Sequence, residues 1–156
     1  MTSEDVYNRF FQRLQNNEVG NDLESDTVDV NVALLDESHS PDLGNHATFS
    51  DVSADEITNT DASDDGYTQG GQTLTTKTIT VDTAERNVDF DADDVTFSDS
   101  TIDARYVLVY HAEPAEETDQ DLIALFDLGE EKSSENADFT IEWSDNGIYR
   151  GDSGGA

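Results

Sequence analysis

The chain has 156 residues, 37 of them Asp or Glu and only 7 Lys or Arg, which gives a formal net charge of −30 at pH 7. Nucleic acids and anionic membranes are bound through cationic groups, so this composition argues against both as direct partners. The length fits one domain, the absence of cysteine excludes disulfides and thiolate chemistry, and we expect neither a membrane span nor a signal peptide.

Residues 3–17 are predicted to form a short amphipathic helix. Ser3 is a suitable N-cap, and the two acidic residues after it favour the positive end of the helix dipole. Val6, Phe10 and Leu14 recur at helical spacing and form an apolar stripe. We expect this helix to pack on its own domain; packing against a neighbouring subunit is the alternative.

A strand and a long polar segment follow. Residues 27–35 alternate apolar and polar side chains, which is typical of a half-buried strand. Residues 36–66 show no such pattern, and a connection of this length is usually functional or an interaction arm. A loop folded back over its own sheet is the alternative. For an arm, we expect contacts with another protein through four dispersed apolar residues: Leu43, Phe49, Val52 and Ile57.

Further strands follow at short intervals, separated by turn residues. The apolar run YVLVY predicts a central strand buried on both faces, and Gly129 is expected to end the strand after it. Residues 82–86 are predicted to form a hairpin turn, and residues 145–147 another turn. The predicted strands lie at residues 73–81, 88–92, 95–97, 106–110, 122–128 and 139–143.

These elements predict a mainly β protein, an antiparallel β-sandwich or barrel of about seven strands with one short N-terminal helix. Residues 1–150 are expected to form a single β domain, and residues 151–156 a flexible tail. The core is predicted to consist of apolar residues on the strands: Val30, Val32, Leu34, Val88, Phe90, Tyr106, Leu108, Leu125, Phe139, Ile141 and Trp143.

The negative charge predicts adaptation to molar salt rather than disorder, because the 7 Phe, 5 Tyr and 1 Trp lie in patterned runs. At about 1 M salt the Debye length is near 3 Å, so repulsion between carboxylates is screened. Only Lys77 and Lys132 are lysine, and Asp outnumbers Glu by 24 to 13. Short carboxylate side chains keep a surface hydrated where salt favours apolar association.

No pattern in the sequence indicates catalysis or ligand binding. His39 and His46 share one segment, but without a third nearby His or Cys their spacing is not that of a metal site, and His111 lies far from both in the sequence. The acidic run at 89–94 lacks the glycine and the bidentate glutamate of a calcium loop. Nucleophile-elbow, P-loop and dinucleotide-binding motifs are absent. We therefore predict no enzymatic activity, no cofactor and no metal site.

Several blocks between residues 26 and 150 resemble a family of small virion structural proteins encoded by tailed double-stranded DNA viruses. The N-terminal helix carries Tyr7, Asn8 and Phe10, which match the start of that family. The other matching blocks are VALLDESHSPDLGNHATFSDV, GYTQGGQTLTTKTIT, NVDFDADDVTFSDSTIDARYVLVY and LIALFDLGEEKSSENADFTIEWSDNGIYR. Together with the extra acidity, the resemblance implies a member from a virus of a halophilic archaeon.

The resemblance and the charge together predict a structural protein on the outer surface of the virion, present in the host cytoplasm during assembly. Capsid decoration or a turret is the expected role, because packaged phosphate would repel so acidic a protein from the inner side of the shell. The alternatives are a neck or tail component and a receptor- or glycan-binding module. Expected partners are the major capsid, neck or tail proteins and further copies of the chain.

The charge predicts that the isolated protein requires salt to fold. Lowering KCl from about 3 M to about 0.05 M lengthens the Debye length more than fivefold, so the carboxylates should repel one another and loosen the sheet. Far-UV circular dichroism and thermal melting across this range measure the effect. A spectrum and a melting temperature that do not change at low salt would contradict adaptation to salt.

Overall fold

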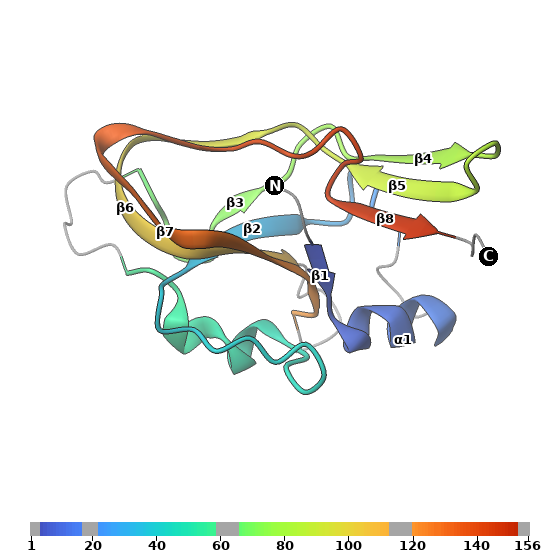
Figure 1. Cartoon of the computed structure of the whole chain (residues 1–156), viewed down its shortest axis with the longest axis horizontal. Coiled ribbons are helices and arrows are strands. Elements are labelled where there is room, and N and C mark those ends of the chain that lie inside the picture. Colours follow the sequence, from blue (N-terminus) through green and yellow to red (C-terminus); the bar gives the residue numbers. More distant parts are fainter. Residues whose placement is uncertain (1–3, 17–21, 59–65, 113–119, 153–156) are drawn as a thin grey trace.

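A computed structural model describes residues 4–16, 22–58, 66–112 and 120–152 of the chain. Its described part is mainly β, as predicted, with eight strands in two antiparallel sheets and one N-terminal α-helix. The five-stranded sheet has the order β1-β7-β6-β2-β3, and the three-stranded sheet the order β4-β5-β8 (Figure 1). No helix in these ranges is both long and apolar enough to cross a lipid bilayer.

The elements, in chain order, are β1 (Glu4–Val6), α1 (Asn8–Asn16), β2 (Val30–Leu35), the 3₁₀ turns η1 (Phe49–Asp51) and η2 (Ser53–Asp55), β3 (Gln72–Thr73), β4 (Thr78–Asp82), β5 (Asn87–Asp91), β6 (Val95–His111), β7 (Leu122–Ile141) and β8 (Tyr149–Asp152).

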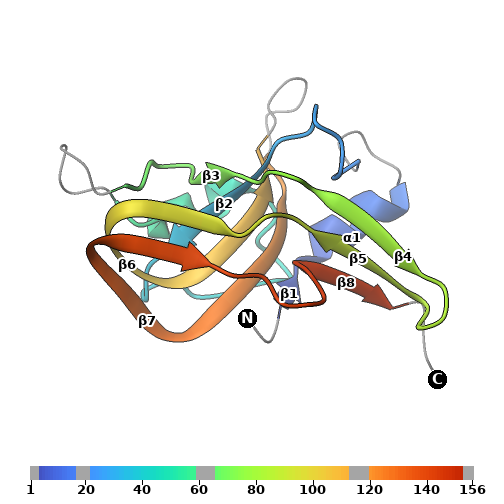
Figure 2. The same ribbon diagram turned by 90° about the horizontal axis from the view of Figure 1, so that it is seen from above.

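The longest elements, β6 and β7, form one antiparallel ribbon that folds back over itself. Their pairing runs from Tyr110 opposite Leu122 to Val95 opposite Ile141, with four shifts of register along the way. In one half of the ribbon the two strands form the centre of the five-stranded sheet. Beyond the bend, the other half lies above that sheet and provides part of a second layer (Figures 1 and 2). The prediction that Gly129 ends a strand is therefore wrong, and the strand predicted at 139–143 is the far end of β7.

Local irregularities allow this bend. Gly129, Asp99 and Asn136 adopt φ values of +83°, +51° and +48°, and bulges of this kind increase the curvature of a paired ribbon. Hydroxyl groups hold the bulged strands together, since the Oγ atoms of Ser100 and Ser134 lie 2.8 Å apart and Ser100 is fully buried. The sequence hides this continuity on β7, because residues 129–138 are almost all polar, while β6 keeps Ile102 and Ala104 buried through the bend.

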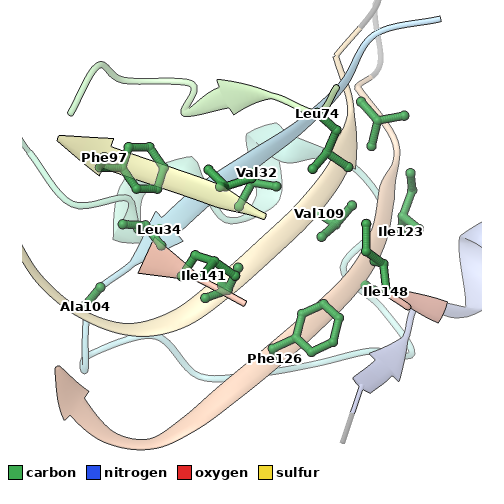
Figure 3. Close-up of a cluster of buried hydrophobic side chains, with 14 of the residues drawn as sticks. Val32, Leu34, Leu74, Phe97, Ala104, Val109, Ile123, Phe126, Ile141 and Ile148 are labelled. Carbon is green, nitrogen blue, oxygen red and sulfur yellow. The ribbon is translucent and has the colours of Figure 1, made fainter. Parts of the chain in front are cut away.

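The main core fills the space between the two layers. Val32, Leu34 and Val109 from the five-stranded sheet face Phe97 and Ile141 from the folded-back ribbon (Figure 3). A second apolar cluster covers the opposite face of the five-stranded sheet and contains Ala33, Leu35, Leu108 and Leu125, among others. The central strands are thus buried on both faces. This confirms the prediction for residues 106–110 and corrects the half-buried assignment of residues 27–35, where β2 has apolar contacts on each side.

The N-terminus differs from its prediction. Residues 4–6 form β1 and pair with β7, so the helix begins at Asn8 rather than at residue 3, and Ser3 lies outside the described residues. The fully buried Tyr7 separates the two elements, and its backbone N–H donates to the carbonyl of Ile123 over 3.0 Å. The ladder with β7 satisfies the backbone groups of residues 4–6, and this pairing across the chain overrides their local helical pattern.

Two further boundaries also differ. The predicted strand at 73–81 is divided into β3 and β4, which belong to different sheets, with Thr76 at a φ of +51° between them. The hairpin between β4 and β5 is confirmed. Gly151 and Asp152 pair with β5 as part of β8, so the predicted tail at 151–156 is wrong at its first two residues, and the rest of it lies outside the described residues.

The predicted core is largely confirmed. Nine of its eleven residues are buried: Val30, Val32, Leu34, Phe90, Tyr106, Leu108, Leu125, Phe139 and Ile141. Trp143 is only partly buried and packs on Phe126, with ring centroids 5.6 Å apart. Val88 was assigned wrongly, because it is 39% exposed. At Val88, strand β5 lies beyond the part of the three-stranded sheet that covers the main core.

Truncation of Phe139 tests the layered core. Its ring is 8% exposed on the folded-back ribbon, so Phe139→Ala should lower the free energy of unfolding by about 3–5 kcal/mol through lost burial and a residual cavity. Chemical denaturation in molar KCl gives the value. Thr80→Ala, at an exposed residue of β4, is the control and should change stability by less than about 1 kcal/mol. Equal effects of the two substitutions would contradict the layer assignment.

Candidate interaction surface

The four residues predicted to contact another protein belong to a segment that packs on its own sheet. Val52 is 1% exposed and Ile57 is 8% exposed, and each lies in one of the two apolar clusters. Leu43 and Phe49 are partly buried against the second cluster, where the ring of Phe49 stacks on Tyr110 with centroids 4.4 Å apart. These side chains form part of the cover of the sheet, which is the alternative interpretation of this segment.

Backbone hydrogen bonds attach the same segment to the sheet along much of its described length, residues 36–58. The N–H of Ile57 donates to the carbonyl of Leu34 over 3.0 Å, and the N–H of Phe49 donates to the carbonyl of Gln120 over 2.7 Å. The N–H of Leu122 donates to the carbonyl of Ala47 over 2.9 Å. Residues 36–58 therefore form a loop folded back over its own sheet, which was the alternative to an arm. That this segment contacts another protein stays a prediction, and residues 59–65 lie outside the described part.

A buried carboxylate helps to hold the next loop in place. Glu56 Oε1 accepts a hydrogen bond from the hydroxyl of Tyr67 over 2.7 Å and one from the N–H of Gly70 over 2.6 Å. The hydroxyl of Tyr110 donates to the carbonyl of Gly70 over 2.7 Å. Burial raises the pKa of Glu56, while the two hydrogen bonds oppose that rise. The sequence contains 36 other acidic residues, and none of its patterns distinguishes Glu56 from them.

Two histidines also meet within the segment. The rings of His39 and His46 lie 5.8 Å apart, and Nδ1 of His39 is 2.8 Å from a carboxylate oxygen of Asp55. Within the described ranges, no group of three or more His, Asp or Glu side chains is arranged to hold a metal ion. The sequence-based prediction that these histidines are not metal ligands remains a prediction.

The acidic run at 89–94 has structural partners. Asp89 receives two hydrogen bonds of 2.6 Å from the guanidinium of Arg150. Asp93 accepts a hydrogen bond from the hydroxyl of Thr76 over 2.6 Å, and Asp94 accepts one from the N–H of Trp143 over 3.0 Å. These carboxylates connect strands and loops within the fold. In a calcium loop they would instead be ligands of the ion.

The exposed apolar side chains gather elsewhere, on α1 and on the three-stranded sheet. Among the described residues, the large hydrophobic side chains that are exposed are Phe11, Leu14, Ile79, Val81 and Val88, with exposures between 37% and 63%. Together with Tyr149 we call these residues the apolar wedge. In both views α1 lies along the same side of the molecule as β4, β5 and β8 (Figures 1 and 2).

Tyr149 links the two parts of the apolar wedge. The ring of Tyr149 on β8 meets the rings of Phe10 and Phe11 on α1, with centroids 5.7 and 6.2 Å away. Tyr149 pairs with Phe90, which pairs in turn with Ile79, while Val88 pairs with Val81. Residues paired across antiparallel strands project from the same face of a sheet. These side chains therefore share one face, and it is the face that Tyr149 turns toward α1.

The sequence contained part of the signal for this surface. The residues of β4 and β5 alternate, but alternation alone does not tell which strand reaches over a core and which projects beyond it. Val88 was assigned to the core for that reason. The wedge also contains Phe11 and Leu14 from the predicted helix, where packing against a neighbouring subunit was the alternative to packing on its own domain.

No protein-family model, curated protein or solved structure matches this chain.

The buried Glu56 predicts a specific dependence of stability on pH. Its pKa is raised in the folded state, so the folded protein binds the proton more tightly, and stability should fall as pH rises from about its ordinary pKa of 4.5 through the folded value. Glu56→Gln keeps an acceptor for Tyr67 and Gly70 but cannot ionise. The stability of the wild type relative to this variant should therefore decrease over that range, measured by chemical denaturation at fixed molar KCl.

Asp51 provides a control of opposite sign. Hydrogen bonds from the N–H groups of Thr48 and Ala47 lower its pKa, so its contribution is present above the ordinary value of 3.8 and is lost as pH falls through the folded value. The wild type should gain stability relative to Asp51→Asn as pH rises through that lower range. The same pH trend for both variants would contradict the assignment of Glu56.

Proposed function

We propose that this chain is a structural protein of a virus particle that functions by associating with other proteins. The observation that carries the proposal is the apolar wedge: in a chain of net charge −30, the exposed large hydrophobic side chains of the described residues gather on one side. Contiguous apolar surface on an otherwise hydrated protein is typical of a protein–protein contact. The resemblance of the sequence blocks to virion structural proteins supports the same class of function.

The charge supports a position on the outer surface of the particle. Many copies at −30 each would repel packaged DNA if they lined the inside of a capsid. On the outside, the same charge keeps a densely covered surface hydrated in molar salt. We therefore favour capsid decoration or a turret on the particle of a tailed virus that infects a halophilic archaeon.

The position of the aromatic residues argues against a receptor- or glycan-binding module. Such modules present exposed aromatic rings on which a sugar stacks. Here Tyr67, Tyr106 and Tyr110 are buried, and the indole of Trp143 packs on Phe126 while its Nε1–H donates to the carbonyl of Asp93 over 3.0 Å. These rings stabilise the fold instead. The exposed ring of Phe11 packs edge-on against Tyr149 within the apolar wedge, where it has apolar neighbours.

Quantitative mass spectrometry of purified particles tests the proposal. A decoration or turret protein should be present at on the order of hundreds of copies per particle, and mild protease treatment of intact particles should reach it. A ring of a few to a dozen copies would replace this role with that of a neck or tail component. Absence of the chain from particles that contain the major capsid protein would overturn the proposed function.

A further inference from the structure

The two faces of the three-stranded sheet differ completely in charge. The register of β4, β5 and β8 puts all four of their carboxylates on one face: Asp82, Asp89, Asp91 and Asp152. Arg150 lies on that face too, paired with Asp89. The other face carries Ile79, Val81, Val88, Phe90 and Tyr149 and has no charged residue. Phe90 on this face is buried in the main core, while Ile79, Val81 and Val88 are exposed. In a protein with a carboxylate at about every fourth position, it is unusual that none lies on this face beside them.

The chain segments around the apolar wedge show the same exclusion of carboxylates. No Asp or Glu occurs in residues 6–16, which include α1, in residues 66–81, which include β3 and most of β4, or in residues 146–151, which include most of β8. These three stretches contain four of the seven cations and have a formal charge of +4, so the rest of the chain carries −34. Apolar exposure and the lack of negative charge are independent observations, and they coincide.

This coincidence restricts the kind of partner. A basic partner would be recognised by carboxylates facing it, and none projects from the face of the sheet that carries Ile79, Val81 and Val88. The carboxylate of Glu24 lies at the edge of β4, where it accepts a hydrogen bond from the N–H of Ile79 over 3.1 Å. The centre of a protein interface is depleted of charge and enriched in apolar and aromatic residues, as this face is. The fitting partner is therefore apolar at its contact and acidic elsewhere, so that its own carboxylates also stay outside the interface. The chain itself carries a surface of that description.

We propose that the apolar wedge is the contact between two copies of this chain, related by a two-fold axis. In such a contact the same surface is used twice, so α1 of each copy can lie against the uncharged face of the other's sheet. The charges at the edge differ in sign, since α1 carries Arg9 and no carboxylate, while the hairpin at the end of the sheet carries Asp82, Glu85 and Arg86 and is acidic on balance. Arg9 also lies 3.8 Å from Asp121 of its own chain, so this difference contributes less to the contact than apolar burial does. The inference rests on the proposed function, because it names a second copy of the chain as one partner for the apolar wedge.

The proposal predicts an unusual dependence of dimerisation on salt. Two copies of charge −30 repel each other over long range, and at about 1 M salt this repulsion is screened beyond roughly 3 Å. Burial of apolar surface is strengthened by salt that is excluded from the protein surface. Dimerisation should therefore tighten as KCl is raised toward about 3 M. A contact held by ion pairs would weaken instead.

Adjacent substitutions on one strand test the proposal. Val81 and Thr80 are both exposed and project from opposite faces of β4, so Val81→Asp and Thr80→Asp add the same charge at neighbouring positions. Sedimentation velocity and light scattering in about 3 M KCl should show a dimer for the wild type and for Thr80→Asp. Val81→Asp should dimerise at least about tenfold more weakly, because the contact would bury an unpaired charge.

A second pair of variants on α1 makes the test independent of the sheet. Leu14→Asp should weaken the dimer like Val81→Asp, while Gln12→Asp, at an exposed position about 160° around the helix from Leu14, should not. Circular dichroism establishes that each variant is folded. A wild type that stays monomeric at all salt concentrations, or a dimer that Val81→Asp and Leu14→Asp leave intact, would overturn the proposal. Because these measurements use the purified chain, they are separate from the particle composition that tests the proposed function.

Discussion

The antiparallel pairing of β6 with β7 is the constraint on which the rest of the structure depends. The two strands, 17 and 20 residues long, run through one layer, bend, and return as part of the other. One ribbon thus provides apolar residues on both sides of the main core. The neighbouring elements complete this arrangement. Strands β1 and β2 extend the first layer on either side of the ribbon, and residues 36–58 cover the outer face of that layer. Without the bend, the apolar residues of the two layers would no longer face each other across the main core.

Carboxylates have a second use in this fold besides hydration. Asp42, Asp51, Asp82 and Asp127 each accept a hydrogen bond from the backbone N–H of a residue two to four positions away. Those bonds lower the pKa of Asp51 and Asp82, while the pKa of Asp42 is lowered above all by the side-chain amide of Asn45 and the pKa of Asp127 above all by Arg105. Only a short side chain can close such a local ring, which is why Asp suits turns better than Glu. The excess of Asp over Glu therefore agrees with the turn-rich architecture as well as with a salt-adapted surface.

The distribution of charge gives the molecule two chemically different sides. Most of the chain carries the negative charge, while α1 and one face of the three-stranded sheet carry none of it. Electrostatic repulsion keeps copies of an acidic protein apart except where carboxylates are absent. Negative charge over most of the surface would therefore direct association to the side that lacks it, as the proposed contact between copies requires.

Composition and periodicity by themselves determined the mainly β class, the N-terminal helix, the central strand at 106–110 and most of the buried residues, because alternation reports directly which side chains avoid water. They could not determine the path of β6 and β7, since residues 129–138 of β7 are almost all polar and the bend is held in part by the hydroxyl pair of Ser100 and Ser134. Only the tertiary structure decided that Val52 and Ile57 turn inward while Val81 and Val88 remain exposed. Burial depends on which element lies opposite a side chain, and that neighbour comes from a distant part of the chain.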